Sequence, residues 1–86
     1  MPKFSGKVHV TLKKSVFDPQ GKTIEQALQT LGFKEAQKVR AGKFFEVDVE
    51  ADSPERASKR LNEMARTLLA NPVIEEYTVS VGSNPA

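Results

Sequence analysis

A pattern of alternating hydrophobic and polar residues runs from Phe4 to Lys14. Apolar residues lie on one parity of this stretch, and lysine, histidine and threonine lie on the other. Successive side chains of a strand point to opposite faces of a sheet, so the pattern predicts a half-buried strand. His9, the single histidine, lies on the polar face without a second candidate ligand nearby. It therefore does not indicate a metal or catalytic site.

A turn and a helix are predicted after this strand. The stretch Asp18–Gly21 has the residue order of a type I turn, and the bulky Phe17 before it hints that the loop is covered by another surface. Thr23–Gln26 forms a capping box, which predicts the start of a helix at Thr23. Apolar residues then recur at helical spacing up to Gly32, which is predicted as the C-terminal cap. The polar residues of this helix are expected to face solvent.

The middle of the chain, Gln37–Glu50, admits two arrangements. Its apolar residues largely share one parity and its charged residues the other. A three-residue turn, Arg40–Gly42, with a bulge would join two antiparallel strands and keep these faces. A single long strand bent at Gly42 would also keep them. The hairpin is preferred, because it completes a βαββαβ order. The predicted fold is thus an α+β, ferredoxin-like two-layer sandwich with two helices on one face of the sheet.

A second helix is predicted from Ser53 and Pro54, which suit the N-cap and the first helical position. Asn71 can adopt the left-handed conformation that closes a helix, and Pro72 cannot continue one, so together they predict its end. The side chains predicted to be buried on this helix are Ala57, Leu61, Met64, Ala65 and Leu68.

The final strand is predicted over Val73–Val81. Val73 and Tyr77 would lie on one face of it, and Ile74 on the other. Residues 1–86 are interpreted as a single domain, in which residues 1–3 and 82–86 are predicted to be frayed.

Size and composition favour association with other chains. A chain of 86 residues buries only about 60 to 65% of its unfolded surface, and this one has no cysteine to cross-link it. Its apolar runs are too short for a membrane span or a signal peptide, so an intracellular protein is expected. Residues 1–43 carry nine Lys or Arg against three acids, whereas residues 44–86 carry four against eight. This asymmetry suits self-association of the two halves better than nucleic-acid binding.

The sequence contains no clear catalytic constellation. There is no cysteine nucleophile, no glycine-rich phosphate loop of the usual spacing, and no paired histidine and acid. The stretch Gly42–Phe45 loosely matches the aromatic strand of RNA-recognition domains. However, Glu46, Asp48 and Glu50 would line the same face and repel phosphates. An RNA-binding module and a small-molecule regulatory domain remain as alternatives, since this fold hosts many functions.

Three motifs together resemble the PurS family, the small subunits of phosphoribosylformylglycinamidine (FGAM) synthase. They are Asp18–Gly21 after a Val-x-Val-x-Leu-Lys strand, then Arg40-x-Gly42-Lys43, and finally Leu69–Tyr77. The resemblance extends from about Lys7 to Val81. It implies a cytoplasmic complex that carries out the fourth step of de novo purine synthesis, the conversion of formylglycinamide ribonucleotide (FGAR) to FGAM with ATP and ammonia from glutamine.

The resemblance also implies the partners and the role of the small subunit. Two copies of it would join the large synthetase subunit PurL and the glutaminase subunit PurQ, and would help ammonia pass between their active sites. The small subunit itself is expected to have no catalytic residue, metal or cofactor, because ATP and Mg²⁺ are used by the synthetase. Self-association as a dimer or tetramer is expected, without nucleic-acid or membrane partners.

Candidate interface residues are taken from the three motifs and from exposed aromatic and apolar positions. They are Phe17, Asp18, Pro19, Gln20, Gly21, Arg40, Gly42, Lys43, Phe44, Asn71, Pro72, Ile74, Glu75 and Tyr77. The first and last motifs are expected to face the synthetase. Charged residues of this set are expected to pair across strands or between subunits, with Lys7, Arg40 and Lys43 near Glu46 or Glu75.

Overall fold

The computed structural model describes residues 1–83 and contains one three-stranded antiparallel sheet. Its strands are β1 (Lys3–Leu12), β2 (Gly42–Glu50) and β3 (Glu75–Ser83), and β1 lies between the other two. Lys3, Gly82 and Ser83 belong to strands, so the prediction that they are frayed is wrong. Residues 84–86, also predicted to be frayed, lie outside the described residues.

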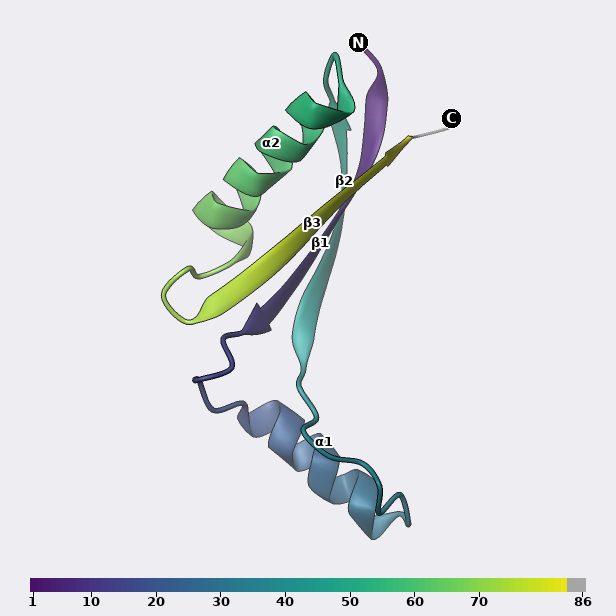
Figure 1. The fold of residues 1–86 in the computed structure, drawn as a ribbon, viewed down its shortest axis with the longest axis vertical. Helices are drawn as coiled ribbons and strands as arrows, with labels where there is room; N and C mark the ends of the chain where they lie inside the picture. The colour runs from purple at the N-terminus through teal and green to yellow at the C-terminus, as the bar shows by residue number, and fades with distance from the viewer. Residues whose placement is uncertain (84–86) are drawn as a thin grey trace.

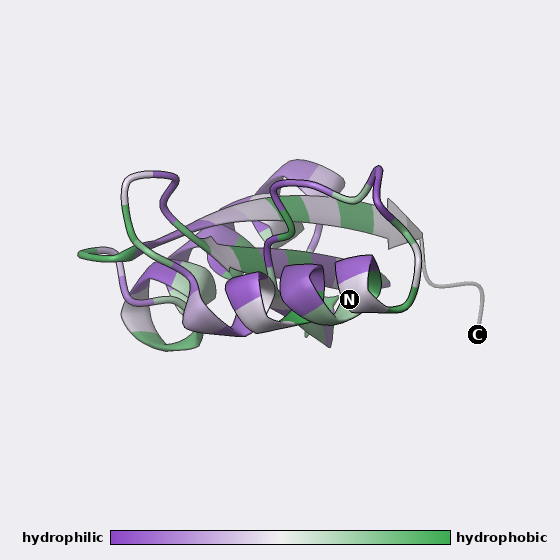
Figure 2. Cartoon of the chain, turned by 90° about the horizontal axis from the view of Figure 1, so that it is seen from below, coloured by the Kyte–Doolittle hydropathy of each residue, from purple (hydrophilic) through white to green (hydrophobic). Residues whose placement is uncertain are grey.

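The alternation predicted for the first strand is confirmed. Val8 and Val10 are fully buried on one face of β1, and His9 between them is exposed on the other. In the register of the sheet, Val8 lies opposite Phe45 of β2 and Val79 of β3. Hydrophobic and hydrophilic bands alternate along the strands for the same reason (Figure 2).

The helix α2 (Pro54–Met64) covers the apolar face of the sheet (Figure 1). It begins where the sequence predicts, because the Ser53 side chain accepts a hydrogen bond from the Arg56 backbone N–H (3.2 Å) and Pro54 occupies the first turn. Gly6 of β1 lies directly beneath Leu61, and a side chain at Gly6 would collide with it. The buried core is small and consists of Val8, Val10, Val49, Ala51, Ala57, Leu61, Ala65 and Ala70.

A π-helical segment, η1 (Ala65–Leu69), continues α2 and changes which leucine is buried. The Ala70 N–H donates to the Ala65 carbonyl at 2.8 Å, which closes a wider turn than that of an α-helix. The wider turn holds one residue more than an α-helical turn, which rotates the side chains that follow relative to a continuous α-helix. Leu69 therefore packs on the core, while Leu68 is 82% exposed. The prediction that Leu68 is buried is therefore wrong.

Asn71 starts a turn instead of closing the helix in the left-handed conformation. Asn71 does not have a positive φ; among the non-glycine residues of 1–83, only Lys38 does. The Asn71 side-chain oxygen accepts from the Val73 N–H (3.1 Å), and its backbone carbonyl accepts from the Glu75 N–H (2.7 Å). These bonds lead the chain into β3 at Glu75, two residues later than predicted.

The first helix, α1 (Pro19–Thr30), lies beyond one end of the sheet and does not pack on its face (Figure 1). The α+β class and the layer formed by α2 are confirmed, but the expected position of α1 on the sheet is wrong. Gly32 follows the helix at φ 104°, and the Phe33 N–H donates to the Leu28 carbonyl (2.9 Å). The predicted glycine cap is therefore confirmed.

The predicted hairpin at Arg40–Gly42 is wrong, and the alternative long strand is not formed either. β2 starts at Gly42, opposite Thr11, near the end of β1. Residues 37–41 do not fold back along the open edge of β2, because the Val39 and Ala41 N–H groups donate to the side chains of Glu25 and Asp18 instead. The sheet consequently has three strands where the prediction had four.

The molecule is elongated, with extents of 51 × 30 × 14 Å and a radius of gyration of 16.4 Å. A compact chain of this length would have a radius of gyration of about 12 Å. In residues 1–83, no helix is both long and apolar enough to cross a membrane.

Candidate partner-binding site at the junction of α1 and the sheet

Asp18 is the central residue of the junction between α1 and the sheet. Its side chain is the N-cap of α1 and accepts from the Gly21 N–H (2.9 Å) and the Ala41 N–H (2.8 Å). Asp18 is only 5% exposed although it carries a charge. The helix thus begins at Pro19, and the predicted capping box at Thr23 is wrong, because an Asp-Pro pair upstream supplies a better N-cap and first residue.

Hydrogen bonding keeps the Asp18 carboxylate ionised. The Gly21 N–H, followed by the Ala41 N–H, lowers the pKa of Asp18 below its ordinary value of 3.8. The positive charge of Arg40 lowers this pKa further, whereas burial acts in the opposite direction. The charged side chain therefore ties the start of α1 to the start of β2.

Arg40 fixes the loop between β1 and α1. Its Nη2 atom donates to the carbonyls of Leu12 (3.2 Å), Lys13 (2.9 Å) and Val16 (3.2 Å). Within residues 1–83 Arg40 forms no ion pair with Glu46 or Glu75, so that part of the charge-pairing prediction is not met inside one chain. The guanidinium instead satisfies carbonyls at the point where the strand ends.

Two glycines of the motifs allow the segments to approach one another closely. A Cβ at Gly21 would collide with the Val39 carbonyl oxygen and lie 2.7 Å from Asp18 Oδ2. A Cβ at Gly42 would collide with the Val10 carbonyl oxygen. Neither position therefore has room for a Cβ unless the neighbouring backbone moves.

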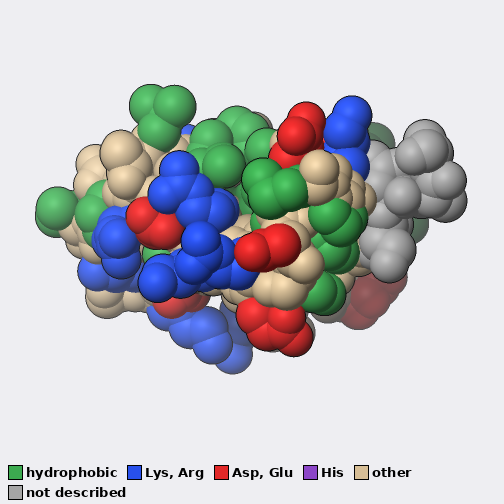
Figure 3. Space-filling model, turned by 90° about the horizontal axis from the view of Figure 1, so that it is seen from above, with side chains coloured by type: hydrophobic (Ala, Val, Ile, Leu, Met, Phe, Trp, Pro, Cys, Tyr) green, Lys and Arg blue, Asp and Glu red, His purple; other side chains and the backbone are tan. Residues whose placement is uncertain are grey.

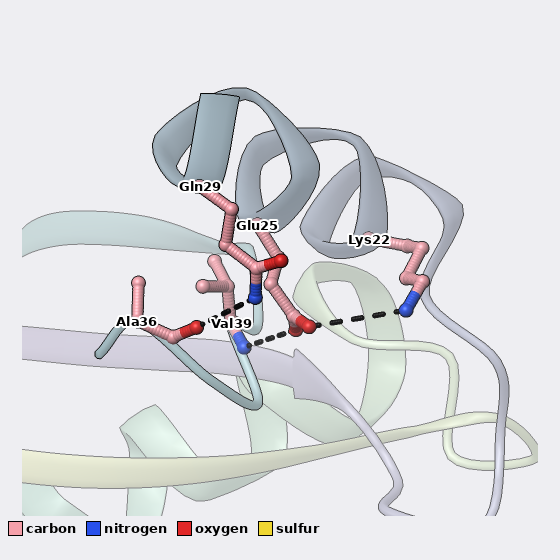
Figure 4. A network of polar contacts seen from close by, with 5 residues as sticks. All are labelled: Lys22, Glu25, Gln29, Ala36 and Val39. Atoms are coloured by element: carbon pink, nitrogen blue, oxygen red, sulfur yellow. Dashed lines mark hydrogen bonds and ion pairs between the residues drawn. The ribbon is translucent and has the colours of Figure 1, made fainter. Parts of the chain in front are cut away.

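A second set of polar contacts holds the segment that returns from α1 (Figure 4). Glu25 accepts from the Val39 N–H (3.3 Å) and forms an ion pair with Lys22 (3.8 Å). Gln29 donates to the Ala36 carbonyl (3.0 Å). The expectation that these helix positions merely face solvent is wrong, because the returning chain covers them.

The third motif joins the same region through an ion pair. Lys43 Nζ lies 3.4 Å from Glu75 Oε2, which confirms the predicted pairing across the sheet. The Asn71 N–H donates to the other oxygen of Glu75 (2.6 Å). Residues from all three motifs line one hollow of about 250 Å³ between the ends of the strands: Asp18, Gln20, Ala41, Gly42, Lys43 and Glu75.

Other candidate residues lie elsewhere. Phe44 is on the uncovered face of the sheet, where its ring is 4.6 Å from that of His9 and it remains 48% exposed. Tyr77 packs against the core, and its hydroxyl donates to the Asn62 carbonyl (3.5 Å). Pro72 and Ile74 are exposed on the turn before β3.

Pro19 also belongs to the candidate set and forms the first turn of α1. Lys7 lies opposite Glu46 in the register, without an ion pair between them in the described part of the chain. The assignment of the whole set to an interface stays a prediction.

A groove beside α1, called the basic groove below, was missed by the sequence interpretation. Its volume is about 480 Å³, and its lining includes Lys14, Phe17, Lys22, Lys38, Val39 and Arg40. The excess of basic residues in the first half of the chain was the available signal. It could not show where they gather, because they come from three separate segments.

Hydrophobic side chains are also exposed among charged ones on several faces. Figure 3 shows such a mixture at the end of the molecule where the termini lie. Large exposed apolar residues include Phe17, Leu31, Phe33, Leu68 and Val73. In the described part of the chain, no group of three or more His, Cys, Asp or Glu residues could hold a metal ion. Fold and site together define a small α+β subunit whose surfaces suit contact with other chains.

Comparison with known proteins gives the family. The model of the family PurS, phosphoribosylformylglycinamidine (FGAM) synthase, matches residues 5–83. The PurS subunit of Archaeoglobus fulgidus is 46% identical over 72 residues, which are 84% of this chain and 90% of that protein. The chain belongs to the PurS family.

Solved structures agree with this assignment. Methanocaldococcus jannaschii PurS superimposes with a TM-score of 0.84 at 34% identity, covering 94% of this chain and 98% of the other. A chain of the PurLQS structure from Thermotoga maritima has a TM-score of 0.87 at 37% identity, covering 94% and 99%. The fold described above is therefore that of PurS proteins.

Proposed function

We propose that this chain is the non-catalytic PurS subunit of an FGAM synthase complex, which carries out the fourth step of de novo purine biosynthesis. The match of the family over residues 5–83 carries this proposal. The similarity to a chain of a PurLQS assembly supports a place beside synthetase and glutaminase subunits. The subunit would bridge these two partners and assist the transfer of ammonia during the ATP- and glutamine-dependent conversion of FGAR to FGAM.

The arrangement of polar groups suits an assembly role. The Asp18 carboxylate is bound by two backbone N–H groups, and Arg40 is bound to three backbone carbonyls. These side chains hold the junction rigid, while residues such as Phe17 and Ile74 extend outward. We infer that ATP and Mg²⁺ act in the synthetase, that the subunit associates with itself, and that the complex is cytoplasmic.

The test is an activity assay with purified synthetase and glutaminase subunits, with and without this protein. Glutamine-dependent formation of FGAM should require the protein, and formation from free ammonium should not. Ammonium-dependent activity serves as the control for an intact synthetase. If glutamine-dependent turnover is the same without the protein, the proposal is wrong.

A further inference from the structure

The apolar stripe of α1 faces water, whereas a polar side of the same helix faces its own chain. Ile24, Ala27 and Leu31 recur at helical spacing, and all three are exposed, Leu31 at 74%. Glu25 and Gln29, in contrast, are half-buried under the segment that returns from α1, and Glu25 also lines the basic groove. In a helix that completes its packing within one chain, the apolar side is the covered one. Within residues 1–83 of one chain, the stripe of α1 is therefore left uncovered.

A hollow beside β2, called the apolar hollow below, is uncovered as well. It lies between β2, an outer strand of the sheet, and the end of the helical segment formed by α2 and η1. Its volume is about 440 Å³, and its apolar lining consists of Val47, Met64, Leu68 and Leu69. The charges of Arg60 and Glu63, which also line it, are paired with each other at 3.4 Å. The hollow therefore suits apolar side chains that carry no charge.

The junction holds α1 away from the apolar hollow of its own chain. Asp18 and Arg40 bind backbone groups on both sides of the helix and fix it beyond the end of the sheet (Figure 1). In the described part of the chain, α2 and η1 are the helical layer on the sheet, and α1 adds nothing to it. A helix that fills the hollow must therefore come from another chain.

The accessible surface of the chain is large enough for a contact of this kind. The chain exposes 6218 Å². A compact monomer of 9.5 kDa would expose about 5,000 Å². The difference of about 1,200 Å² exceeds the roughly 800 Å² that one partner buries in a typical stable interface. A twofold dimer makes each contact twice, so association with a second copy would cover the stripe and the hollow of both chains.

We propose that α1 of a second copy of the chain docks its apolar stripe into the apolar hollow, and that the exchange is reciprocal about a twofold axis. Ile24 and Leu31 of one copy are then covered by Met64 and Leu68 of the other. This inference rests on the self-association in the proposed function, and it assigns two surfaces of the chain to that association. The widened turn of η1, which exposes Leu68, supplies one wall of the docking site.

The experiment places opposite charges on the two surfaces of the full chain. Leu31→Lys adds a cation to the stripe and Leu68→Glu adds an anion to the hollow, both at positions exposed in the single chain. Each variant alone should approach the monomer mass in light scattering, because both copies of the contact would then bury an unpaired charge. An equimolar mixture should regain the wild-type mass. In a mixed pair one contact is unchanged, and the other joins a lysine to a glutamate.

Gln26→Lys is the matched control, because it adds the same charge at an exposed polar position of α1. This variant should keep the wild-type mass by itself, and it should leave Leu68→Glu monomeric when the two are mixed. Circular dichroism checks that every variant is folded.

Several results would overturn the docking of α1 in the apolar hollow. A Leu68→Glu variant with the wild-type mass would show that the hollow stays open in the assembly. A mixture of Leu31→Lys and Leu68→Glu that stays monomeric would show that the two surfaces do not meet. Equal restoration by Gln26→Lys would reduce the effect to net charge. A monomeric wild type would contradict the proposed self-association as well, whereas the other three results would contradict this inference alone.

Discussion

Single residues at the junction show how a few polar contacts position α1 without a hydrophobic interface to the sheet. Asp18 connects the first turn of α1 to Ala41, and Arg40 connects the same segment to the end of β1. These bonds run between parts of the chain more than twenty residues apart. The orientation of α1 therefore depends on a handful of side chains, and changes at these positions should have measurable effects.

The charge of Asp18 should make stability depend on pH. Its folded pKa is lowered, so its contribution to stability is complete above the unfolded value of 3.8 and declines as the pH falls from there through the folded pKa. Wild type should therefore lose more stability between pH 5 and pH 3 than the Asp18→Asn variant, as measured by urea unfolding with circular dichroism. The exposed Asp48→Asn variant is the control and should retain the acid sensitivity of the wild type. Equal acid sensitivity of Asp18→Asn and wild type would contradict this role.

Replacement of Gly21 by alanine tests the close approach of α1 to the returning segment. Alanine would gain about 0.5 to 1 kcal/mol from helix propensity. The new Cβ would collide with the Val39 carbonyl, however, and such overpacking costs about 1 to 3 kcal/mol. We expect a net loss of about 1 to 2 kcal/mol in the free energy of unfolding. Gln26→Ala, on an exposed position of the same helix, should be nearly neutral; a stabilised Gly21→Ala variant would show that the segment can move away.

At the level of elements, local patterns in the sequence were sufficient for β1, the start of α2 and the C-terminal glycine cap of α1, but not for the start of α1. They failed where one element depends on another. The parity of Val39 and Phe45 suited a hairpin, but the N–H groups of Val39 and Ala41 donate to side chains of the α1 region and do not pair along β2. The widened turn of η1 has no local signature in the sequence, so the exposure of Leu68 could not be predicted. The meeting of the three motifs likewise depends on the path of α1, which no local pattern encodes.

The widened turn of η1 leads to opposite expectations for two leucines of one continuous helical segment. Leu61 is fully buried, so Leu61→Ala should lower the free energy of unfolding by about 3 kcal/mol. Leu68 is exposed, so Leu68→Ala should change it by less than about 0.5 kcal/mol in dilute protein. Urea unfolding followed by circular dichroism measures both. If Leu68→Ala lowers the free energy of unfolding strongly at every protein concentration, Leu68 is part of the core and η1 does not turn it toward solvent.

The whole molecule combines a small core with a helix that extends away from it. Within residues 1–83 the buried cluster consists of Val, Leu and Ala side chains, and α1 lies outside the layer that contains it (Figure 1). The radius of gyration is well above that of a compact chain of 86 residues. A chain of this shape leaves apolar side chains of α1 in water, and association with another copy would remove them from it.

Self-association can therefore be tested through α1. Ile24 and Leu31 are exposed, Leu31 at 74%, and replacing both by glutamate would put two charges where a partner chain should cover apolar surface. We expect wild type to have a multiple of the monomer mass in light scattering and the Ile24→Glu/Leu31→Glu variant to approach the monomer mass. Gln26→Glu/Thr30→Glu adds the same charge on the polar side of α1 and should keep the wild-type mass. Both variants change the same helix and have the same net charge, so an equal loss of mass in the two would indicate charge repulsion. An unchanged mass of Ile24→Glu/Leu31→Glu would place the contact between copies on another surface. Phe44 and Ile74 would then be the next positions to replace by glutamate.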